Sequence, residues 1–236
     1  MNLTEHYNKL YKESIGEISS DNYEIDPMLH AENDQRFGMS LLIKPPMAVK
    51  NEIQKFLEEL KSIEPDQYYY PNSDIHITVI SVVSCYDGLK LSNLNVPEYI
   101  ELIEKSLENA QHMTINCKGI TASPSCIMIQ GFIEGNGLNE IRDNLRRNFK
   151  DSNLEQSIDE RYLIQTAHAT VFRFSEQLKE KEEFLALVDK YRNHDFGTFK
   201  VNTMELSYND WYHREGLVTK LHEFKMANTD VKTQRA

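Results

Sequence analysis

The chain has 236 residues, a length that suits one large domain or two closely joined lobes. Apolar residues make up 40% of the sequence, which is enough for a packed core, yet no apolar run approaches the ~20 residues that a membrane helix needs. The formal net charge is −11 and Lys and Arg form no run, so binding to long nucleic acid is not expected, and any phosphate ligand should be small.

Residues 1–35 are polar and show no convincing period, which predicts an N-terminal extension that wraps or caps the body of the protein. Their mixed charge is not typical of a secretory signal. A strand is expected at 37–43, followed by a helix whose apolar residues recur at spacings of three and four. This helix should end near Glu64, because the residue before a proline disfavours helix.

The remaining elements alternate between strands and helices. Strands are expected at 74–85, 113–120, 126–133, 165–174, 196–210 and 217–226, and helices at 98–109, 137–149 and 176–192. Each half of the chain thus contains a strand, a helix and a further strand with a His-x-Thr triplet. This order favours two related α+β lobes over a parallel βαβ array.

The cysteines Cys85, Cys117 and Cys126 are odd in number and lack the spacing of metal ligands. They predict reduced, buried thiols in a cytoplasmic protein. A redox or nucleophilic role is the minor alternative. The sequence carries no indication of the oligomeric state.

The His-x-Thr triplets at His76–Thr78 and His168–Thr170 lie in otherwise apolar strands. Chance placement of 8 His and 11 Thr in this chain would give about 0.4 such triplets, and three are present. Because side chains alternate along a strand, His76 and Thr78 should share one face with Ile80. An imidazole and a hydroxyl two residues apart can contact one phosphate-sized group together, although a single triplet could equally be a polar seam of a strand.

The third triplet, His112 to Thr114, lies at the start of its strand, just after a helix. Its face continues with Asn116 and Lys118, a pattern typical of an edge that faces solvent. We therefore predict a structural role for His112 and Thr114.

"HITV" at 76–79 and "HATV" at 168–171 resemble the paired signatures of the 2H phosphoesterase superfamily, which includes 2′-5′ RNA ligase-like proteins and 2′,3′-cyclic nucleotide phosphodiesterases. The resemblance covers about residues 36–226, including "RFGMSLLIKPP" and "YYYPNSDIHITV" before the first motif and "INCKGITASPSCIMIQGF" before the second. Residues 1–35 have no counterpart in the minimal fold of the superfamily, and 227–236 are expected to form a C-terminal tail.

The resemblance implies a bilobal α+β fold, in which two antiparallel-sheet lobes with outer helices flank a central cleft. It also implies a phosphoesterase that requires no metal or other cofactor. His76 and His168 would share the roles of general acid and base, and which of them is the base stays open. Thr78 and Thr170 would donate hydrogen bonds to the phosphate oxygens. The expected substrate is a small cyclic phosphate, such as a 2′,3′-cyclic nucleotide or RNA end, or a 2′-5′ phosphodiester.

Four further residues are candidates for substrate binding. Arg173 follows the second motif at a spacing seen in many members of the superfamily, but strand parity points it away from His168 unless the strand bulges. An ion pair within its lobe is an equally good prediction for Arg173. Tyr70, Trp211 and Tyr212 are candidates to stack on a nucleobase, although packing is the commoner fate of a single aromatic residue.

Two other functions fit parts of the pattern. The same cleft could bind a nucleotide or RNA end without turnover. A metal-dependent hydrolase would use the histidines and carboxylates as ligands, but these residues do not cluster at the spacing of a metal site.

Overall fold

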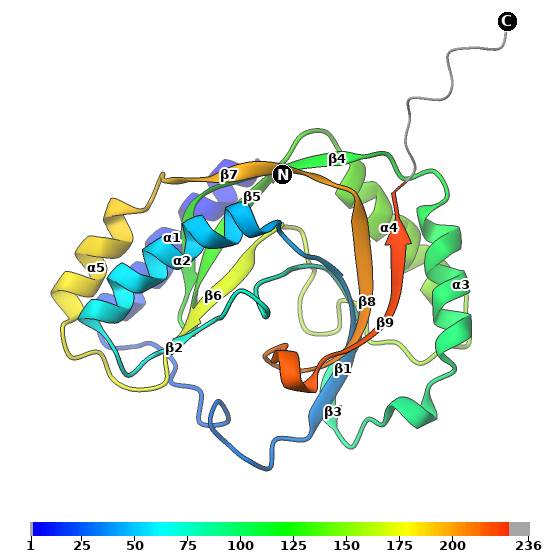
Figure 1. The fold of residues 1–236 in the computed structure, drawn as a ribbon, viewed down its shortest axis with the longest axis horizontal. Coiled ribbons are helices and arrows are strands. Elements are labelled where there is room, and N and C mark those ends of the chain that lie inside the picture. Colours follow the sequence, from blue (N-terminus) through cyan, green and yellow to red (C-terminus); the bar gives the residue numbers. More distant parts are fainter. Residues whose placement is uncertain (1, 227–236) are drawn as a thin grey trace, which may run out of the picture.

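The computed structural model describes residues 2–226, and it places two antiparallel sheets opposite one another with helices on their outer sides (Figure 1). Sheet A has the order β3-β1-β8-β9 and consists of β1 (Arg36–Ile43), β3 (Ile77–Asp87), β8 (Thr203–Asp210) and β9 (Thr219–Lys225). Sheet B has the order β2-β6-β5-β4-β7 and consists of β2 (Tyr68–Tyr69), β4 (Met113–Ser123), β5 (Cys126–Ile133), β6 (Ala169–Arg173) and β7 (Asp195–Val201). The predicted α+β fold with two antiparallel-sheet lobes is confirmed.

The helices divide between the two lobes. On the side of sheet B lie α1 (Leu3–Ser19), α2 (Met47–Ile63) and α5 (Lys181–Lys190), and on the side of sheet A lie α3 (Val96–Leu107) and α4 (Gly137–Lys150) (Figure 1). The helix α2 follows β1 of sheet A but packs on β6 and β7 of sheet B. The helix α4 follows β5 of sheet B but contacts β3 of sheet A. Each lobe therefore draws on both halves of the sequence, and the chain crosses between the lobes repeatedly.

The segment predicted as one strand at 196–210 is two strands. The strand β7 pairs with β4 in sheet B, and β8 pairs with β1 in sheet A, with Asn202 between them. The last predicted helix is also shorter than expected. The carboxylate of buried Glu64 accepts hydrogen bonds of 2.7 Å from the backbone N–H groups of Lys179 and Glu180, just ahead of α5.

The segment 1–35 contains the helix α1, which the spacing of its apolar residues does not predict. The side chain of Asn2 accepts hydrogen bonds from the N–H groups of Thr4 and Glu5 and caps this helix. Its buried residues against β4 are of mixed type, namely Tyr7, Ser14 and Ile18, so no apolar stripe marks the packed face. The boundary at residue 35 stays a prediction, and the expected tail at 227–236 lies outside the described residues.

His112 and Thr114 lie at the start of β4, which pairs with β5 on one side and β7 on the other. The expectation that this triplet occupies a sheet edge is therefore wrong. The Nδ1 atom of His112 lies 3.3 Å from the Val201 carbonyl oxygen of the neighbouring segment. This strand is thus an interior member of sheet B.

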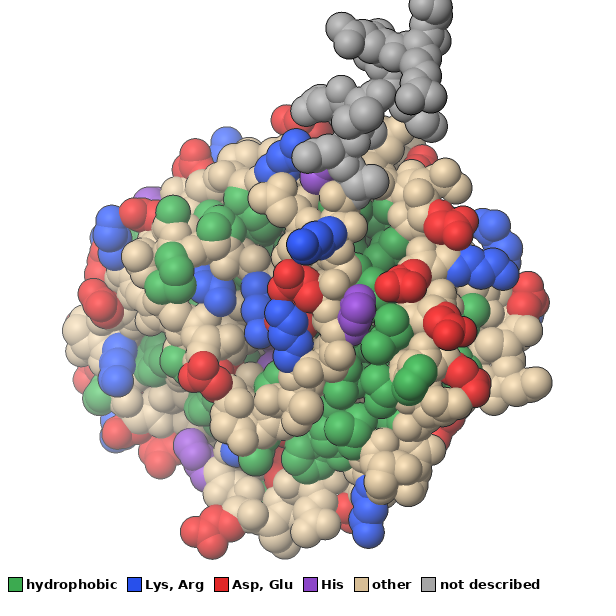
Figure 2. All heavy atoms as spheres, turned by 45° about the vertical axis from the view of Figure 1, so that its right-hand side comes forward, with side chains coloured by type: hydrophobic (Ala, Val, Ile, Leu, Met, Phe, Trp, Pro, Cys, Tyr) green, Lys and Arg blue, Asp and Glu red, His purple; other side chains and the backbone are tan. Residues whose placement is uncertain are grey.

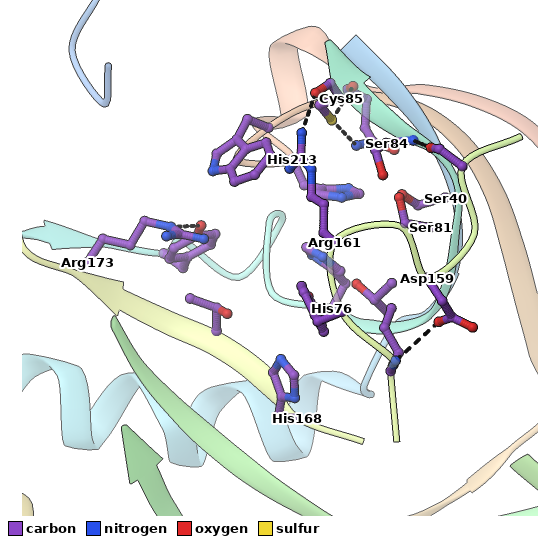
Figure 3. Close-up of a pocket in the computed structure, with 18 residues that line it drawn as sticks. Ser40, His76, Ser81, Ser84, Cys85, Asp159, Arg161, His168, Arg173 and His213 are labelled. Atoms are coloured by element: carbon purple, nitrogen blue, oxygen red, sulfur yellow. Dashed lines mark hydrogen bonds between the residues drawn. The ribbon is translucent and has the colours of Figure 1, made fainter. Parts of the chain in front are cut away.

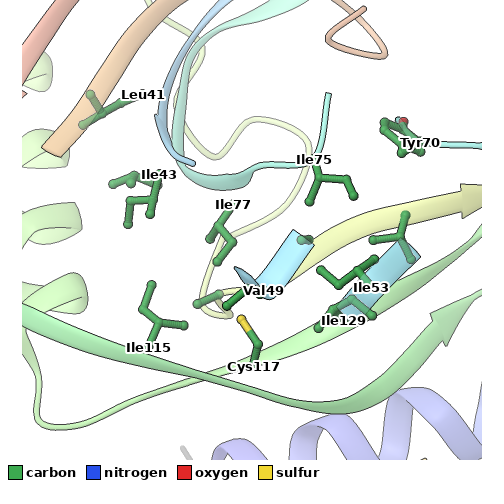
Figure 4. Packing of buried hydrophobic residues seen from close by; sticks show 14 of the residues in the cluster. Leu41, Ile43, Val49, Ile53, Tyr70, Ile75, Ile77, Ile115, Cys117 and Ile129 are labelled. Atoms are coloured by element: carbon green, nitrogen blue, oxygen red, sulfur yellow. The ribbon is translucent and has the colours of Figure 1, made fainter. Parts of the chain in front are cut away.

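One hydrophobic cluster joins the two sheets beneath the first motif (Figure 4). Ile75 and Ile77 flank His76 in the sequence and are 0% and 1% exposed. They pack in this cluster with Val49 and Ile53 of α2 and with strands of sheet B. Burial of each such side chain is worth roughly 1.5–3 kcal/mol, so the backbone is anchored on both sides of His76. Among residues 2–226, no helix has the length and apolar character needed to span a bilayer.

Candidate active site

The four residues of the first two triplets line one cavity between the sheets (Figure 3). The space between the lining residues measures about 910 Å³ when the open solvent at its mouth is included. His76 and Thr78 come from the start of β3, and His168 and Thr170 from the start of β6. The structure thus brings together two segments that lie far apart in the sequence. The third triplet, at His112, does not contribute to the lining of this cavity.

Irregular pairing between β1 and β3 sets which side chains of β3 face the cavity. Register shifts interrupt the ladder three times, and one of them lies between the pairs Leu42–Thr78 and Leu41–Ile80. As a result, Ile80 turns into the core and is fully buried, which corrects the expected sharing of a face with Thr78. The polar residues Ser81 and Ser84 line the cavity instead, so from Thr78 to Ser84 this strand presents every third residue, and Cys85 follows directly.

A second bulge decides the orientation of Arg173. In the pairing of β5 with β6, Ile127 faces Phe172 and Met128 faces Thr170, so Val171 is an extra residue. The bulge reverses the parity of the strand beyond it. Arg173 therefore lines the same cavity as Thr170, and its Nε donates a 2.9 Å hydrogen bond to the hydroxyl of Tyr70.

His76 is held by its own loop and by a third histidine. Its Nδ1 lies 2.6 Å from the Asp74 carbonyl oxygen, which can only accept, so Nδ1 carries the proton and the neutral ring keeps its lone pair on Nε2. The ring of His213 lies against it, with 3.9 Å between the ring centroids. His213 has a φ of 58°, a left-handed conformation that few residues other than glycine adopt. Such strained positions are frequent at functional sites.

His168 has a different partner. Its Nδ1 lies 2.7 Å from the hydroxyl oxygen of Thr166. Because a hydroxyl can donate or accept, the neutral ring of His168 can carry its proton on either nitrogen. The structure therefore constrains the tautomer of His76 and leaves that of His168 free to change.

The electrostatics of the cavity keep the imidazoles neutral. Burial is the largest cause that lowers the pKa of His76 to about 4, and positive charges including Lys44 add to it. Burial also lowers the pKa of His168 to about 4, with Arg142 as the next cause. The pKa of His213 lies well below its usual value for the same reason. At neutral pH the cavity thus presents uncharged imidazoles.

Arg142 of α4 connects the two motif segments from behind. It is 1% exposed, and its guanidinium donates to the carbonyl oxygens of Val79 (2.8 Å), Thr78 (3.2 Å) and Thr166 (2.7 Å). In this clamp, Nε and Nη2 hold the backbone of the first motif, and Nη2 also holds the residue two before His168. Burial lowers the pKa of Arg142 to about 10, so the group remains charged at neutral pH.

The aromatic candidates separate into two groups. Tyr70 and Trp211 line the cavity, and the guanidinium carbons of Arg36 and Arg161 lie 5.0 and 4.3 Å from the centroid of the Trp211 ring. Tyr212 does not reach the cavity, which corrects its assignment as a residue that stacks on a base. It is fully buried, and its hydroxyl donates a 2.8 Å hydrogen bond to a carboxylate oxygen of Asp26.

Several residues of the cavity are absent from the predicted site. They are Ser40, Ser81, Ser84, Cys85, Ser157, Asp159, Arg161, Tyr162, Ile164, Asn209 and His213. The period-three row of β3 depends on bulges, which have no clear signal in this sequence. His213 follows Trp211 and Tyr212 closely in "WYH", and a search for a third histidine beside aromatic candidates could have found it.

Charges of both signs cover the outside of the protein. On the face shown in Figure 2, the described Lys and Arg side chains are interspersed with Asp and Glu and form no extended basic patch. Within residues 2–226, no three His, Cys, Asp or Glu side chains are grouped so that they could hold a metal ion.

Solved structures with this fold come from several bacteria. E. coli LigT, solved in complex with 3′-AMP, matches with a TM-score of 0.56 and 12% identity, over 82% of this chain and 99% of LigT. TT0787 of Thermus thermophilus matches with a TM-score of 0.54 and 15% identity, over 80% and 97% of the two chains. ATU0111 of Agrobacterium tumefaciens gives a TM-score of 0.55 and 12% identity, over 85% and 95%. Comparison with curated proteins gives no match.

The two-lobed fold, with a paired His-x-Thr motif in its cleft, is that of the 2H phosphoesterase superfamily, as the resemblance predicts. Residues 38–215 match the family described as AKAP7 2'5' RNA ligase-like domain. The chain belongs to this family.

Proposed function

We propose that this protein is a metal-independent phosphodiesterase that opens a small cyclic phosphate, such as a 2′,3′-cyclic nucleotide or RNA end, or cleaves a 2′-5′ phosphodiester. The observation that carries the proposal is the convergence of His76, Thr78, His168 and Thr170 on one cavity. Membership of a 2′-5′ RNA ligase-like family supports it. The complexes of E. coli LigT with 3′-AMP, ATP and NADP+ support a small nucleotide as the ligand.

Thr78 and Thr170 would bind the phosphate. Within the described part of the chain, neither hydroxyl makes a hydrogen bond, so both can donate to non-bridging oxygens. Arg173 adds a positive charge at the same cavity, and Tyr70 fixes its position. Donors already held in place stabilise the negative charge that grows in the transition state without reorganisation.

His76 would be the base and His168 the acid. The Asp74 carbonyl holds the proton of His76 on Nδ1, so its Nε2 can take a proton from water as the oxygen attacks phosphorus. His168 would act as the imidazolium, in which Nδ1–H donates to the Thr166 hydroxyl oxygen and Nε2–H is left for the leaving ribose oxygen. The bond from phosphorus to the ribose oxygen then breaks, and that oxygen receives the proton of His168. The anionic substrate favours the imidazolium forms and raises both pKa values from about 4 during turnover.

Hydrolysis of 2′,3′-cyclic nucleotides in EDTA tests the proposal. We expect His76→Ala and His168→Ala each to lower kcat by about 100-fold or more, the usual contribution of an acid–base group. His112→Ala is the matched control, since it removes the histidine of the third triplet outside the cavity, and it should retain activity. Absence of hydrolysis of any cyclic phosphate or 2′-5′ diester, or activity that survives both substitutions, would overturn the proposal.

A binding module that uses the same cleft is the second candidate. The low pKa values of His76 and His168 favour it, because neither ring is charged at neutral pH and an acid–base pair needs one charged ring. Calorimetry that finds tight nucleotide binding with no product by chromatography would select this function over the first.

A further inference from the structure

The cavity extends beyond the proposed phosphate site along β3 into a region that we call the serine arm, formed by Ser40, Ser81, Ser84 and Asn209. Ser40 and Ser81 face each other across the β1–β3 pair. None of the three serine hydroxyls makes a hydrogen bond to another described residue. The mechanism of phosphate hydrolysis does not use these groups, so they are free to recognise another part of the substrate.

Asn209 is the most informative member of the serine arm. It is 1% exposed, and its Nδ2 donates a 2.9 Å hydrogen bond to the Asp210 carbonyl oxygen. Because that oxygen can only accept, the amide orientation is fixed, and Oδ1 is buried without any partner. Buried polar atoms of this kind are rare in folded proteins and call for an explanation. A hydrogen-bond donor on the ligand would satisfy Oδ1.

The serine arm itself carries no positive charge that would bind a second phosphate. The unpartnered oxygen of Asn209 would repel an anion, and the nearby carboxylate of Asp159 is paired with Arg146 at 2.5 Å. The guanidinium of Arg161 donates a 2.7 Å hydrogen bond to the Cys85 carbonyl oxygen and lies over Trp211. The serine arm therefore fits a neutral, planar group that carries both N–H donors and acceptors.

The register of the strands gives the distances between the proposed phosphate site at Thr78 and the serine arm. Thr78 pairs with Leu42 of β1, Ser81 pairs with Ser40, and Asn209 of β8 pairs with Gly38 of β1. Ser40 and Gly38 lie two and four residues along β1 from Leu42, which is roughly 7 and 13 Å at ~3.3 Å per residue. These distances match the length of one nucleoside whose phosphate is bound at Thr78.

We propose that the serine arm binds the nucleobase next to the scissile phosphate, and that Asn209 Oδ1 accepts a hydrogen bond from an exocyclic amino group. The site should then prefer adenine or cytosine to the corresponding oxo bases, hypoxanthine and uracil. This assignment rests on the proposed function for the position of the phosphate. The serine hydroxyls, which can donate or accept, satisfy the ring nitrogens of either base.

Calorimetric titration with matched pairs of nucleotides tests the assignment without any need for turnover. We expect 3′-AMP to bind at least about tenfold more tightly than 3′-IMP, and 3′-CMP more tightly than 3′-UMP, because the oxo base places an exocyclic acceptor against Oδ1 where the amino base places a donor. Equal affinities within each pair, or no measurable binding of any of the four, would overturn the assignment.

Two variants test the role of Asn209 directly. Asn209→Ala should lower the affinity for 3′-AMP to that for 3′-IMP. Asn116→Ala is the matched control, since Asn116 Oδ1 is also buried without a partner but lies in β4 outside the cavity, and it should keep the preference. A preference that persists in Asn209→Ala with an unchanged melting temperature refutes the role of Asn209. If that variant does not fold, the wild-type pairs still decide the matter.

Ribose 2′,3′-cyclic phosphate, which has no base, separates this assignment from the proposed function. Hydrolysis of this compound that depends on His76, together with equal affinities for the matched nucleotides, would refute the base assignment alone. A clear preference for amino bases without hydrolysis of any substrate would refute the turnover alone.

Discussion

Replacement of Arg142 by Met should strongly lower the stability of the protein. The guanidinium donates three hydrogen bonds to backbone carbonyls, and hydrogen bonds from a charged donor contribute roughly 1.5–3 kcal/mol each. The cost of burying the charge offsets part of this sum, and it is enlarged here because Nη1 has no partner. Since methionine offers these three carbonyl oxygens no donor, we expect a loss of about 3–5 kcal/mol in the free energy of unfolding.

The same substitution should change the titration of His168. The charge of Arg142 is the second cause of the low pKa of His168, after burial. Removal of the charge should raise this pKa above about 4, but burial should keep it below the usual 6.5. Arg142 is not among the main causes of the low pKa of His76, so His76 serves as an internal reference.

Urea unfolding followed by circular dichroism gives the stability, and NMR titration of the histidine rings gives both pKa values. Arg142→Lys is the control, because it retains the charge but cannot reach two strands with a planar fork. It should lose stability while leaving the pKa of His168 low. A stability loss under about 1 kcal/mol in Arg142→Met, or equal shifts at both histidines, would refute the clamp.

Three further outcomes follow from the site. Because folding lowers the pKa of His76 and His168 from 6.5 to about 4, the unfolded chain binds more protons between these values. Stability should therefore fall as pH decreases through this window and level off below it, by on the order of 3 kcal/mol per histidine, and His168→Gln should flatten the curve obtained by urea unfolding. Gly131→Ala should lower stability by about 1–3 kcal/mol in thermal unfolding, because a Cβ there would overlap the Ala167 carbonyl oxygen. Cys85 should react slowly with iodoacetamide at pH 8 in mass spectrometry, since burial raises its pKa to about 12; rapid labelling of the native protein would contradict this.

Local patterns predict most of the elements and fail where long-range pairing decides. The helix α2 has apolar residues at spacings of three and four and ends at Glu64, as expected. The break at Asn202, in contrast, arises because the chain passes from sheet B to sheet A, and an unbroken run of β-formers does not record that change of partner. The helix α1 is missed because Ser14 faces the sheet and hydrogen-bonds to the Ala122 carbonyl in place of an apolar contact.

The residues of the candidate site are likewise predicted where the pattern is local and missed where long-range strand pairing decides. The motifs give the histidines and threonines of both strands, since each spacing of two is local. Strand parity then gives the wrong face for Ile80 and leaves Arg173 undecided, because each lies beyond a β-bulge. Tyr212 is predicted from its neighbour Trp211, but both residues lie in the turn after β8, and only Trp211 reaches the cavity.

The support of His168 extends beyond the family match at 38–215. Tyr7 of α1 donates a 3.3 Å hydrogen bond to the Gly131 carbonyl oxygen, and its hydroxyl also interacts with the side chain of Thr166. Thr166 in turn contacts Nδ1 of His168, and Arg142 holds the carbonyl of the same threonine. Whether the Thr166 hydroxyl donates to His168 or to Tyr7 sets which nitrogen of His168 carries the proton. The N-terminal helix and α4 thus both contact Thr166, α1 at its hydroxyl and α4 at its carbonyl oxygen, and through this residue they position the ring of the proposed acid.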